Sequence, residues 1–169
     1  AIWREEDNAL QLIVLPDVTV PAEKRDDIYK ALGLINEQLW IGQLKSEPRN
    51  VQEFDRLLKM ASLRLSDAHL TNLSNEGRFN SAYSAAHAAA LAALRWHGYR
   101  SENRFTVFQC LAHTLGWPPH QWRVLDAAHQ KRNLAEYEGY WDIPESAIDE
   151  ICNLLPDLIA AVEKLKTTP

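Results

Sequence analysis

The feature that most constrains the fold is an alanine-rich segment near the middle of the chain. Between Phe79 and His97, alanine recurs at positions 82, 85, 86, 88, 89, 90, 92 and 93. A helix with alanine on nearly every side lets neighbouring backbones approach it closely from several directions. The segment therefore predicts a central, buried helix in a helical bundle, and Gly98 is expected to end it.

Apolar residues at helical spacing mark the segments on either side of this helix. Residues 51–73 and 121–138 predict two long helices, residues 105–115 predict a shorter one, and a last helix starts at Pro144. We expect Pro156 to kink that last helix. Short connections between such helices favour an up-and-down arrangement. The predicted fold class is mainly α, an antiparallel four- or five-helix bundle.

The first 44 residues follow a different pattern. Residues 9–15 are a short apolar run suited to a buried strand, residues 20–39 are typical of a helix opened by Pro21, and residues 40–44 begin a second strand. The sequence thus predicts a small N-terminal β-α-β appendage at 1–44, followed by the helical bundle at 45–169.

The net charge of −5 is unevenly distributed. Residues 1–44 hold four basic and eight acidic side chains, which gives −4, and residues 45–169 hold fourteen and fifteen, which gives −1. An acidic chain argues against bulk, salt-driven binding of nucleic acid. A local basic cluster of Arg95, Arg100 and Arg104 with His97 could still contact RNA or an acidic protein, although solvated surface charge is the commoner explanation.

Apolar runs and cysteines indicate the cellular environment. No run reaches the length that a membrane helix needs, and no charged-then-apolar signal segment opens the sequence. Cys110 and Cys152 both lie among apolar neighbours in helical patterns, so we expect free, reduced core thiols. These features predict a soluble, cytoplasmic protein.

Motifs for the common catalytic chemistries are missing from the sequence. The six histidines lie at no spacing typical of a zinc site, and the six glycines form no phosphate-binding loop. No nucleophile elbow is present either. We therefore expect neither a metal nor a cofactor.

The most informative polar segment is residues 129–139, in the second half of the helix predicted at 121–138. At about 100° per residue, one side of this helix is apolar and predicted to face the core: Val124, Ala127, Ala128, Leu134 and Ala135. The other side is predicted to form an outward binding face: Trp122, Asp126, His129, Asn133 and Tyr140, flanked by Arg132, Glu136 and Tyr137. Such a face suits recognition better than mere solvation. In the alternative interpretation, Arg132 and Glu136 are an ordinary surface ion pair and the aromatic residues pack on the next helix.

Two segments together resemble the HEPN-domain family. They are RFNSAYSAAHAAALAALRWHGYR, at 78–100, and KRNLAEYEGY, at 131–140, and the resemblance spans most of residues 46–165. It implies a helical bundle that dimerises. In ribonucleases of this family, Arg and His from two subunits meet at the dimer interface and the ribose 2′-hydroxyl cleaves the RNA without metal.

This chain departs from the family motif at its last position. The usual motif ends in His, and here Tyr137 takes that place. A phenol has an unperturbed pKa of about 10, so it is a poor base near pH 7. If the chain cleaves RNA, Arg132 would hold the phosphate, Asn133 would orient it and His129 would transfer the proton, in an order that the family pattern does not predict.

Residues 3–44 resemble an internal fragment of the YbjN family, whose α+β fold is related to that of type III secretion chaperones. The resemblance rests on the strand, the segment VPAEKRDDIYKALGLINEQLW at 20–40 and the W-I-G run that follows. We know no natural family that joins such a fragment to a HEPN-like bundle. The junction at 44/45 therefore suggests a recombined, engineered or computationally generated chimera.

The sequence favours a binding protein over an enzyme. We expect a non-catalytic HEPN-like bundle that acts as the antitoxin or immunity-type partner in a bacterial toxin–antitoxin or defence system, because the motif histidine is missing and the acidic appendage could mask a basic toxin. The expected partners are a second copy, forming a homodimer, and a toxin protein; RNA is a weaker expectation and a membrane is not expected. The alternatives are a dimeric, metal-independent endoribonuclease toxin and a purely structural dimerisation module.

Overall fold

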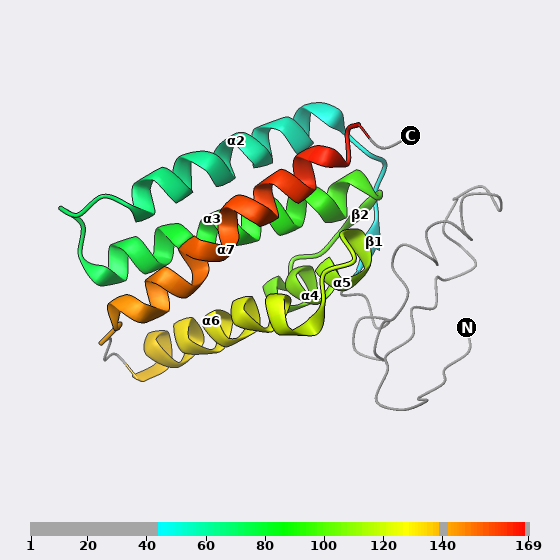
Figure 1. Ribbon diagram of the computed structural model, residues 1–169. Coiled ribbons are helices and arrows are strands. Elements are labelled where there is room, and N and C mark those ends of the chain that lie inside the picture. Colours follow the sequence, from blue (N-terminus) through cyan, green and yellow to red (C-terminus); the bar gives the residue numbers. More distant parts are fainter. Residues whose placement is uncertain (1–43, 139–141, 168–169) are drawn as a thin grey trace.

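The computed structural model describes residues 44–138 and 142–167, without the side chains of Ala135 and Glu138. This part is mainly helical, with one small antiparallel sheet. The elements are β1 (Lys45–Ser46), α2 (Val51–Ala68), α3 (Asn75–Trp96), β2 (Tyr99–Arg100), α4 (Arg104–Gln109), α5 (Leu111–Thr114), α6 (Pro119–Glu138) and α7 (Glu145–Lys164). In Figure 1, α2, α3 and α7 run side by side, and α6 lies along the edge of the bundle away from α2. The predicted helical bundle is confirmed at this level, and the β-α-β appendage at 1–44 lies outside the described residues.

Helix α3 is the central helix, as its alanines predict. It begins after Ser74, whose side chain accepts a hydrogen bond from the Gly77 N–H, and it contacts each of the other helices. All eight alanines between positions 82 and 93 are buried. Because their side chains are small, α2 and α7 can both pack directly on the α3 backbone.

Helices α2 and α7 cover α3 with the apolar stripes that the sequence indicates. The Asn50 side chain caps α2 by accepting from the Glu53 N–H, and α2 ends at Ala68 rather than at residue 73. Helix α7 is continuous through Pro156. Its buried apolar residues recur at helical spacing, as predicted: Ile148, Ile151, Leu155, Leu158, Ile159 and Val162.

The helix predicted at 105–115 is two short helices, α4 and α5, which meet at Cys110. The chain then turns at Gly116, which has a φ of 66°, and the Trp117 N–H donates to the Leu111 carbonyl. Phe108 and Leu111 are both fully buried.

The two-stranded sheet closes the end of the bundle. Lys45 pairs with Arg100 and Ser46 with Tyr99 in antiparallel register. Leu44 precedes β1 and is not part of it, and residues 40–43 of the predicted second strand lie outside the described residues. Pairing with β2 ties the start of the bundle segment to the end of α3.

Beside this sheet, two arginines of the predicted basic cluster belong to a partly buried ion-pair network, which we call the Arg95 cluster: Arg95, Arg100, Glu47 and Glu53. Arg95 is only 1% exposed, and its Nε donates to Glu53 Oε2 at 3.0 Å. Arg100 Nε donates to Glu47 Oε2 at 2.7 Å, and its other nitrogen pairs with Glu53. Arg95 is therefore not part of an exposed basic surface, and Arg100, which is partly exposed, is paired with two carboxylates. His97 is also occupied, since its Nε2 contacts the Thr114 carbonyl oxygen at 3.2 Å.

The orientation of α6 is the main correction to the sequence analysis. Leu125 is fully buried and Ala128 nearly so, whereas Leu134 is 57% exposed and Ala127 is exposed. Trp122, Asp126, His129 and Asn133, predicted to face outward, are half-buried. The prediction failed because alanine on both sides of α6 gives only a weak apolar pattern. A polar side chain can face inward when a distant element supplies its hydrogen-bond partner.

The two cysteines match the expectation of free core thiols. Both are buried and neither forms a disulfide. Burial raises the pKa of the Cys110 thiol to about 12, which keeps it protonated and unreactive. Within the described ranges, no helix combines the length and apolar character required to cross a membrane.

Candidate functional site

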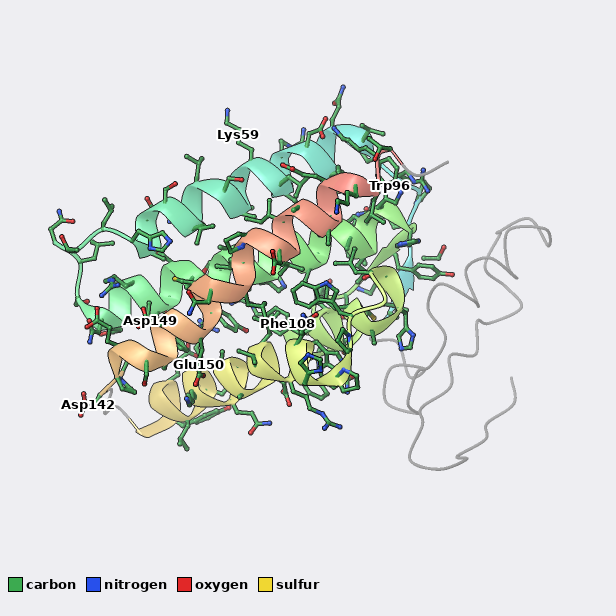
Figure 2. All side chains as sticks on the ribbon, viewed as in Figure 1. Lys59, Trp96, Phe108, Asp142, Asp149 and Glu150 are labelled. Carbon is green, nitrogen blue, oxygen red and sulfur yellow. The ribbon has the colours of Figure 1, made fainter. Side chains whose placement is uncertain are left out.

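The candidate site lies where α3, α4 and α6 meet, around the side chain of Tyr83. Tyr83 interrupts the alanines of α3 and is only 1% exposed. Phe108, labelled in Figure 2, reaches from α4 and packs edge-on against the Tyr83 ring, with centroids 5.7 Å apart. This contact fixes the ring, so that its hydroxyl meets the polar side of α6. We call the group formed by Tyr83, Arg104, His129, Arg132, Asn133 and Glu136 the Tyr83 cluster.

His129 is held between two hydrogen-bonding partners. Its Nδ1 lies 2.7 Å from the Tyr83 hydroxyl oxygen, and its Nε2 lies 3.0 Å from Asn133 Nδ2, one turn further along α6. Burial lowers the pKa of His129, and the charges of Arg132 and Arg104 lower it further, against the opposing effect of Asp126. The imidazole is therefore neutral near pH 7, and neither ring nitrogen is left without a partner.

Two guanidinium groups flank the same phenol. The Cζ atom of Arg132 lies 5.3 Å from the centroid of the Tyr83 ring, and that of Arg104 lies 5.5 Å from it. Burial raises the pKa of Tyr83, while hydrogen bonding and charge from both arginines lower it less. Arg132 also pairs with Glu136 at 2.6 Å. No carboxylate of the described residues lies within ion-pair distance of Arg104.

His87 lies next to the cluster, one helical turn after Tyr83. Its ring packs edge-on against Phe108, with centroids 6.1 Å apart. Burial lowers its pKa to about 4, and the charges of Arg104, His129 and Arg132 act in the same direction. His87 is thus a neutral interior side chain at neutral pH. It supplies no charge to the cluster.

The structure brings together the three residues proposed for catalysis, His129, Arg132 and Asn133, with Glu136 from the predicted binding face. Asp126 and Trp122 are half-buried on the same side of α6, and Asp126 accepts a hydrogen bond from Gln130. Tyr137 is 91% exposed and is not part of the cluster. Tyr140, the last residue of the predicted face, lies outside the described residues.

Sequence reasoning missed Tyr83 and gave Arg104 a different role. Tyr83 is a large polar residue inside a run of alanines, and that contrast is the signal that could have singled it out. Arg104 was assigned to a surface cluster with Arg95 and Arg100, from which the structure separates it. Proximity in sequence grouped these three arginines, although they belong to two different clusters.

The outward side of α6 carries a second feature, which we call the outer stripe: Arg123, Ala127, Gln130, Leu134 and Tyr137. All five side chains are exposed. They follow one another at steps of four, three, four and three residues, so they lie along one line on the helix. Leu134 and Tyr137 therefore form an apolar patch at the C-terminal half of α6.

The chemistry available to the two surfaces differs. The Tyr83 cluster offers guanidinium and phenol groups that suit an anion, while the imidazole is already hydrogen-bonded on both sides. Among the residues that the structure describes, no three His, Cys, Asp or Glu side chains lie close enough to hold a metal ion. The outer stripe offers apolar and aromatic area with no ionisable group apart from Arg123 and the phenol of Tyr137.

Comparisons with known proteins identify no relative. No protein-family model matches the chain, and neither a curated protein nor a solved structure matches it. The HEPN-like and YbjN-like resemblances therefore stay predictions, and the function is inferred from the geometry of the two surfaces of α6.

Proposed function

We propose that this protein is a non-catalytic, HEPN-like helical bundle that works by binding another protein. The observation that carries the proposal is the engagement of His129, whose two ring nitrogens face Tyr83 and Asn133. An imidazole that acts as a general base must have a free nitrogen within hydrogen-bond reach of the proton that it takes. Tyr137, which occupies the position of the motif histidine, points into solvent. The imidazole that α6 places beside Arg132 is therefore already hydrogen-bonded on both sides.

The outer stripe is the proposed contact surface. Exposed Leu134 and Tyr137 provide the apolar and aromatic area that is enriched at the centre of protein interfaces. Gln130 and Arg123 add polar groups along the same line, as expected at the rim of an interface. A helix at the edge of the bundle can present this line without rearranging the core.

For the partner, we propose a toxin protein, with this chain as the antitoxin or immunity-type member of the pair. Residues 1–44 carry a net charge of −4, and an acidic segment favours a basic partner by complementary charge. The homodimer expected from the HEPN resemblance would use the same stripe. The two kinds of complex differ in mass, so light scattering separates them.

The docking surface is tested with the double variant Leu134→Ser/Tyr137→Ser in the full chain. Both variant and wild type serve as baits in a lysate of cells that make the chain, with Lys131→Ser, another exposed residue of α6, as the matched control. Any retained protein is then purified and titrated against all three. We expect wild type and Lys131→Ser to bind the retained protein with equal affinity, and the double variant to bind it at least about tenfold more weakly. If the chain binds itself instead, light scattering should show the same order among the three proteins. Equal binding by all three, or binding by none, contradicts the docking surface.

The non-catalytic part of the proposal is tested with labelled total RNA. We expect no cleavage by the wild-type chain at neutral pH, with or without divalent metal. Cleavage that is lost in both Arg132→Ala and His129→Ala but retained in Lys131→Ala would replace this proposal with the second candidate.

That second candidate is a dimeric, metal-independent endoribonuclease. The observation in its favour is that His129, Arg132 and Asn133 do lie together, with the side chain of Arg132 24% exposed. For catalysis, His129 would have to release Asn133 or Tyr83 and accept a proton from a ribose 2′-hydroxyl. Arg132 would then stabilise the charge that develops on the phosphate.

A further inference from the structure

We propose that Arg104, Arg132 and the Tyr83 hydroxyl form a binding site for a phosphate-monoester group, and that Glu136 occupies this site when no ligand is bound. The site lies on the inner side of α6, so it is distinct from the outer stripe. The proposal requires neither a protein partner nor cleavage of RNA, and it brings in two residues from outside α6.

The first observation is the convergence of two guanidinium groups on one buried phenol. Arg104 comes from the first residue of α4 and Arg132 from the middle of α6, and their Cζ atoms lie 5.5 Å and 5.3 Å from the Tyr83 ring centroid. The Tyr83 hydroxyl lies within hydrogen-bond distance of His129, and burial raises the pKa of Tyr83 more than the charges of both arginines lower it. Two positive charges thus lie next to one phenol at a half-buried place.

The second observation is the incomplete pairing of these charges. In the described part of the chain, Glu136 is the one carboxylate within ion-pair distance of either arginine, and it reaches only Arg132. Asp126 is nearby but accepts from Gln130 and pairs with neither arginine. By contrast, the two arginines of the Arg95 cluster share two carboxylates. The Tyr83 cluster therefore has one positive charge more than it has paired negative charges, which favours binding of an anion.

Glu136 behaves as an internal substitute for the ligand. Its side chain is 54% exposed and it follows Arg132 by one helical turn. An exposed pair at this spacing is weak, so the carboxylate can turn to solvent at small cost. Its departure would leave Arg132 and Arg104 both available to one ligand.

The chemistry of the donors selects the class of ligand. Planar guanidinium groups bind phosphate oxygens through paired N–H bonds, and a phenol hydroxyl adds a further donor. A phosphate monoester carries close to two negative charges near pH 7, because its second pKa is about 6. It therefore matches two arginines better than a singly charged phosphodiester or carboxylate does. The dianion could come from the 5′ end of a nucleotide or, without the ester bond, from free inorganic phosphate.

Calorimetric titration of the full chain tests the site. The probes are inorganic phosphate, adenosine 5′-monophosphate and, as the control ligand, adenosine. The variants are Arg104→Gln, Arg104→Lys, Arg132→Gln and Glu136→Gln, with Lys131→Gln as the matched control because Lys131 is an exposed cation on the same helix. Circular dichroism checks that each variant is folded, and Arg104→Lys keeps the charge while it removes the planar fork.

We expect wild type and Lys131→Gln to bind both phosphate probes but not adenosine. Arg104→Gln, Arg104→Lys and Arg132→Gln should each bind at least about tenfold more weakly, and Glu136→Gln more tightly. Binding should also weaken from pH 7.5 to pH 5.5, as the ligand becomes a monoanion. Tighter binding of the nucleotide than of inorganic phosphate would identify a nucleotide end as the source. Absence of phosphate binding to wild type, or equal binding by the arginine variants and Lys131→Gln, would overturn the site.

Discussion

Two arginine clusters lie at different places along α3, one at Tyr83 and one at Arg95, and their positive charges are paired to different extents. In the Arg95 cluster, two arginines meet two glutamates, and Arg95 further donates to the carbonyl oxygens of Glu47 and Pro48 at 3.0 Å and 2.8 Å. In the Tyr83 cluster, two arginines meet one phenol and one exposed glutamate. The first arrangement leaves no guanidinium nitrogen of Arg95 without an acceptor, whereas the second leaves Arg104 without a carboxylate among the described residues.

This difference separates a structural cluster from a candidate binding site. The hydrogen bonds of Arg95 join α3 to α2, to β2 and to the segment that follows β1, so they hold the end of the bundle together. Burial raises the pKa of Glu53, yet hydrogen bonds from Arg100 and Arg95 outweigh it and leave the pKa below its usual value. Charges that are fully paired stabilise the fold but bind nothing further. An incompletely paired charge keeps the capacity to bind a ligand.

The largest expected effect belongs to Arg95→Gln. The change leaves Glu53 and the carbonyl oxygens around Arg95 without their buried donor, and breaking a buried ion pair costs about 3–5 kcal/mol. The free energy of unfolding, measured by urea denaturation at pH 7, should fall by that amount. Arg64→Gln, which breaks an exposed pair with Asp67, is the control and should change it by less than about 0.5 kcal/mol. If Arg95→Gln changed the free energy of unfolding as little as Arg64→Gln does, the Arg95 cluster would not be a structural cluster.

The next effect concerns His87 beside the Tyr83 cluster. Its pKa is about 4 in the folded protein and 6.5 in the unfolded chain. Between these values the unfolded chain binds more protons, so stability is complete above pH 6.5 and is lost as the pH falls. From pH 7.5 to pH 5, this histidine should lower the free energy of unfolding by about 2 kcal/mol.

His87→Gln should remove that part of the pH dependence. The measurement is urea denaturation of wild type and variant at both pH values. His120→Gln, the same change at an exposed position, should keep the wild-type dependence. An unchanged slope in His87→Gln would mean that this side chain is already protonated or solvated in the folded protein.

A smaller effect is expected for Tyr83→Phe. The ring and its contact with Phe108 remain, but His129 Nδ1 loses its partner, and one such hydrogen bond contributes about 1 kcal/mol. Tyr137→Phe removes a hydroxyl from a side chain that is 91% exposed, so it should leave stability unchanged. Equal effects of the two changes would show that the bond between Tyr83 and His129 does not stabilise the fold.

The smallest effect should come from Arg104→Gln. Because Arg104 has no carboxylate partner among the described residues, loss of its charge should change the free energy of unfolding by less than about 1 kcal/mol. The same substitution at Arg95 provides the reference, measured under the same conditions. If Arg104→Gln destabilised the protein as much as Arg95→Gln, the Tyr83 cluster would be as structural as the Arg95 cluster.

Much of the bundle could be predicted because its signals are local. Caps, breakers and apolar spacing lie within a few residues of the elements that they define, as at Ser74 for α3 and Asn50 for α2. The split into α4 and α5 at Cys110 was not predicted. Of the residues that form the Tyr83 cluster, His129, Arg132 and Asn133 lie in the segment that the sequence singled out, whereas Tyr83 and Arg104 are too distant in sequence for a periodic pattern to connect them.

The sequence by itself determined which segments are helical and that α3, with its alanines, is the helix on which the others pack. Alanine side chains let any neighbouring helix approach α3 closely, so the central position of α3 can be inferred from its own sequence. Only the tertiary structure decided which side of α6 faces inward and which arginines find carboxylates. Those outcomes depend on hydrogen bonds such as that between Tyr83 and His129, 46 residues apart, whose free energy exists only once both helices are in place.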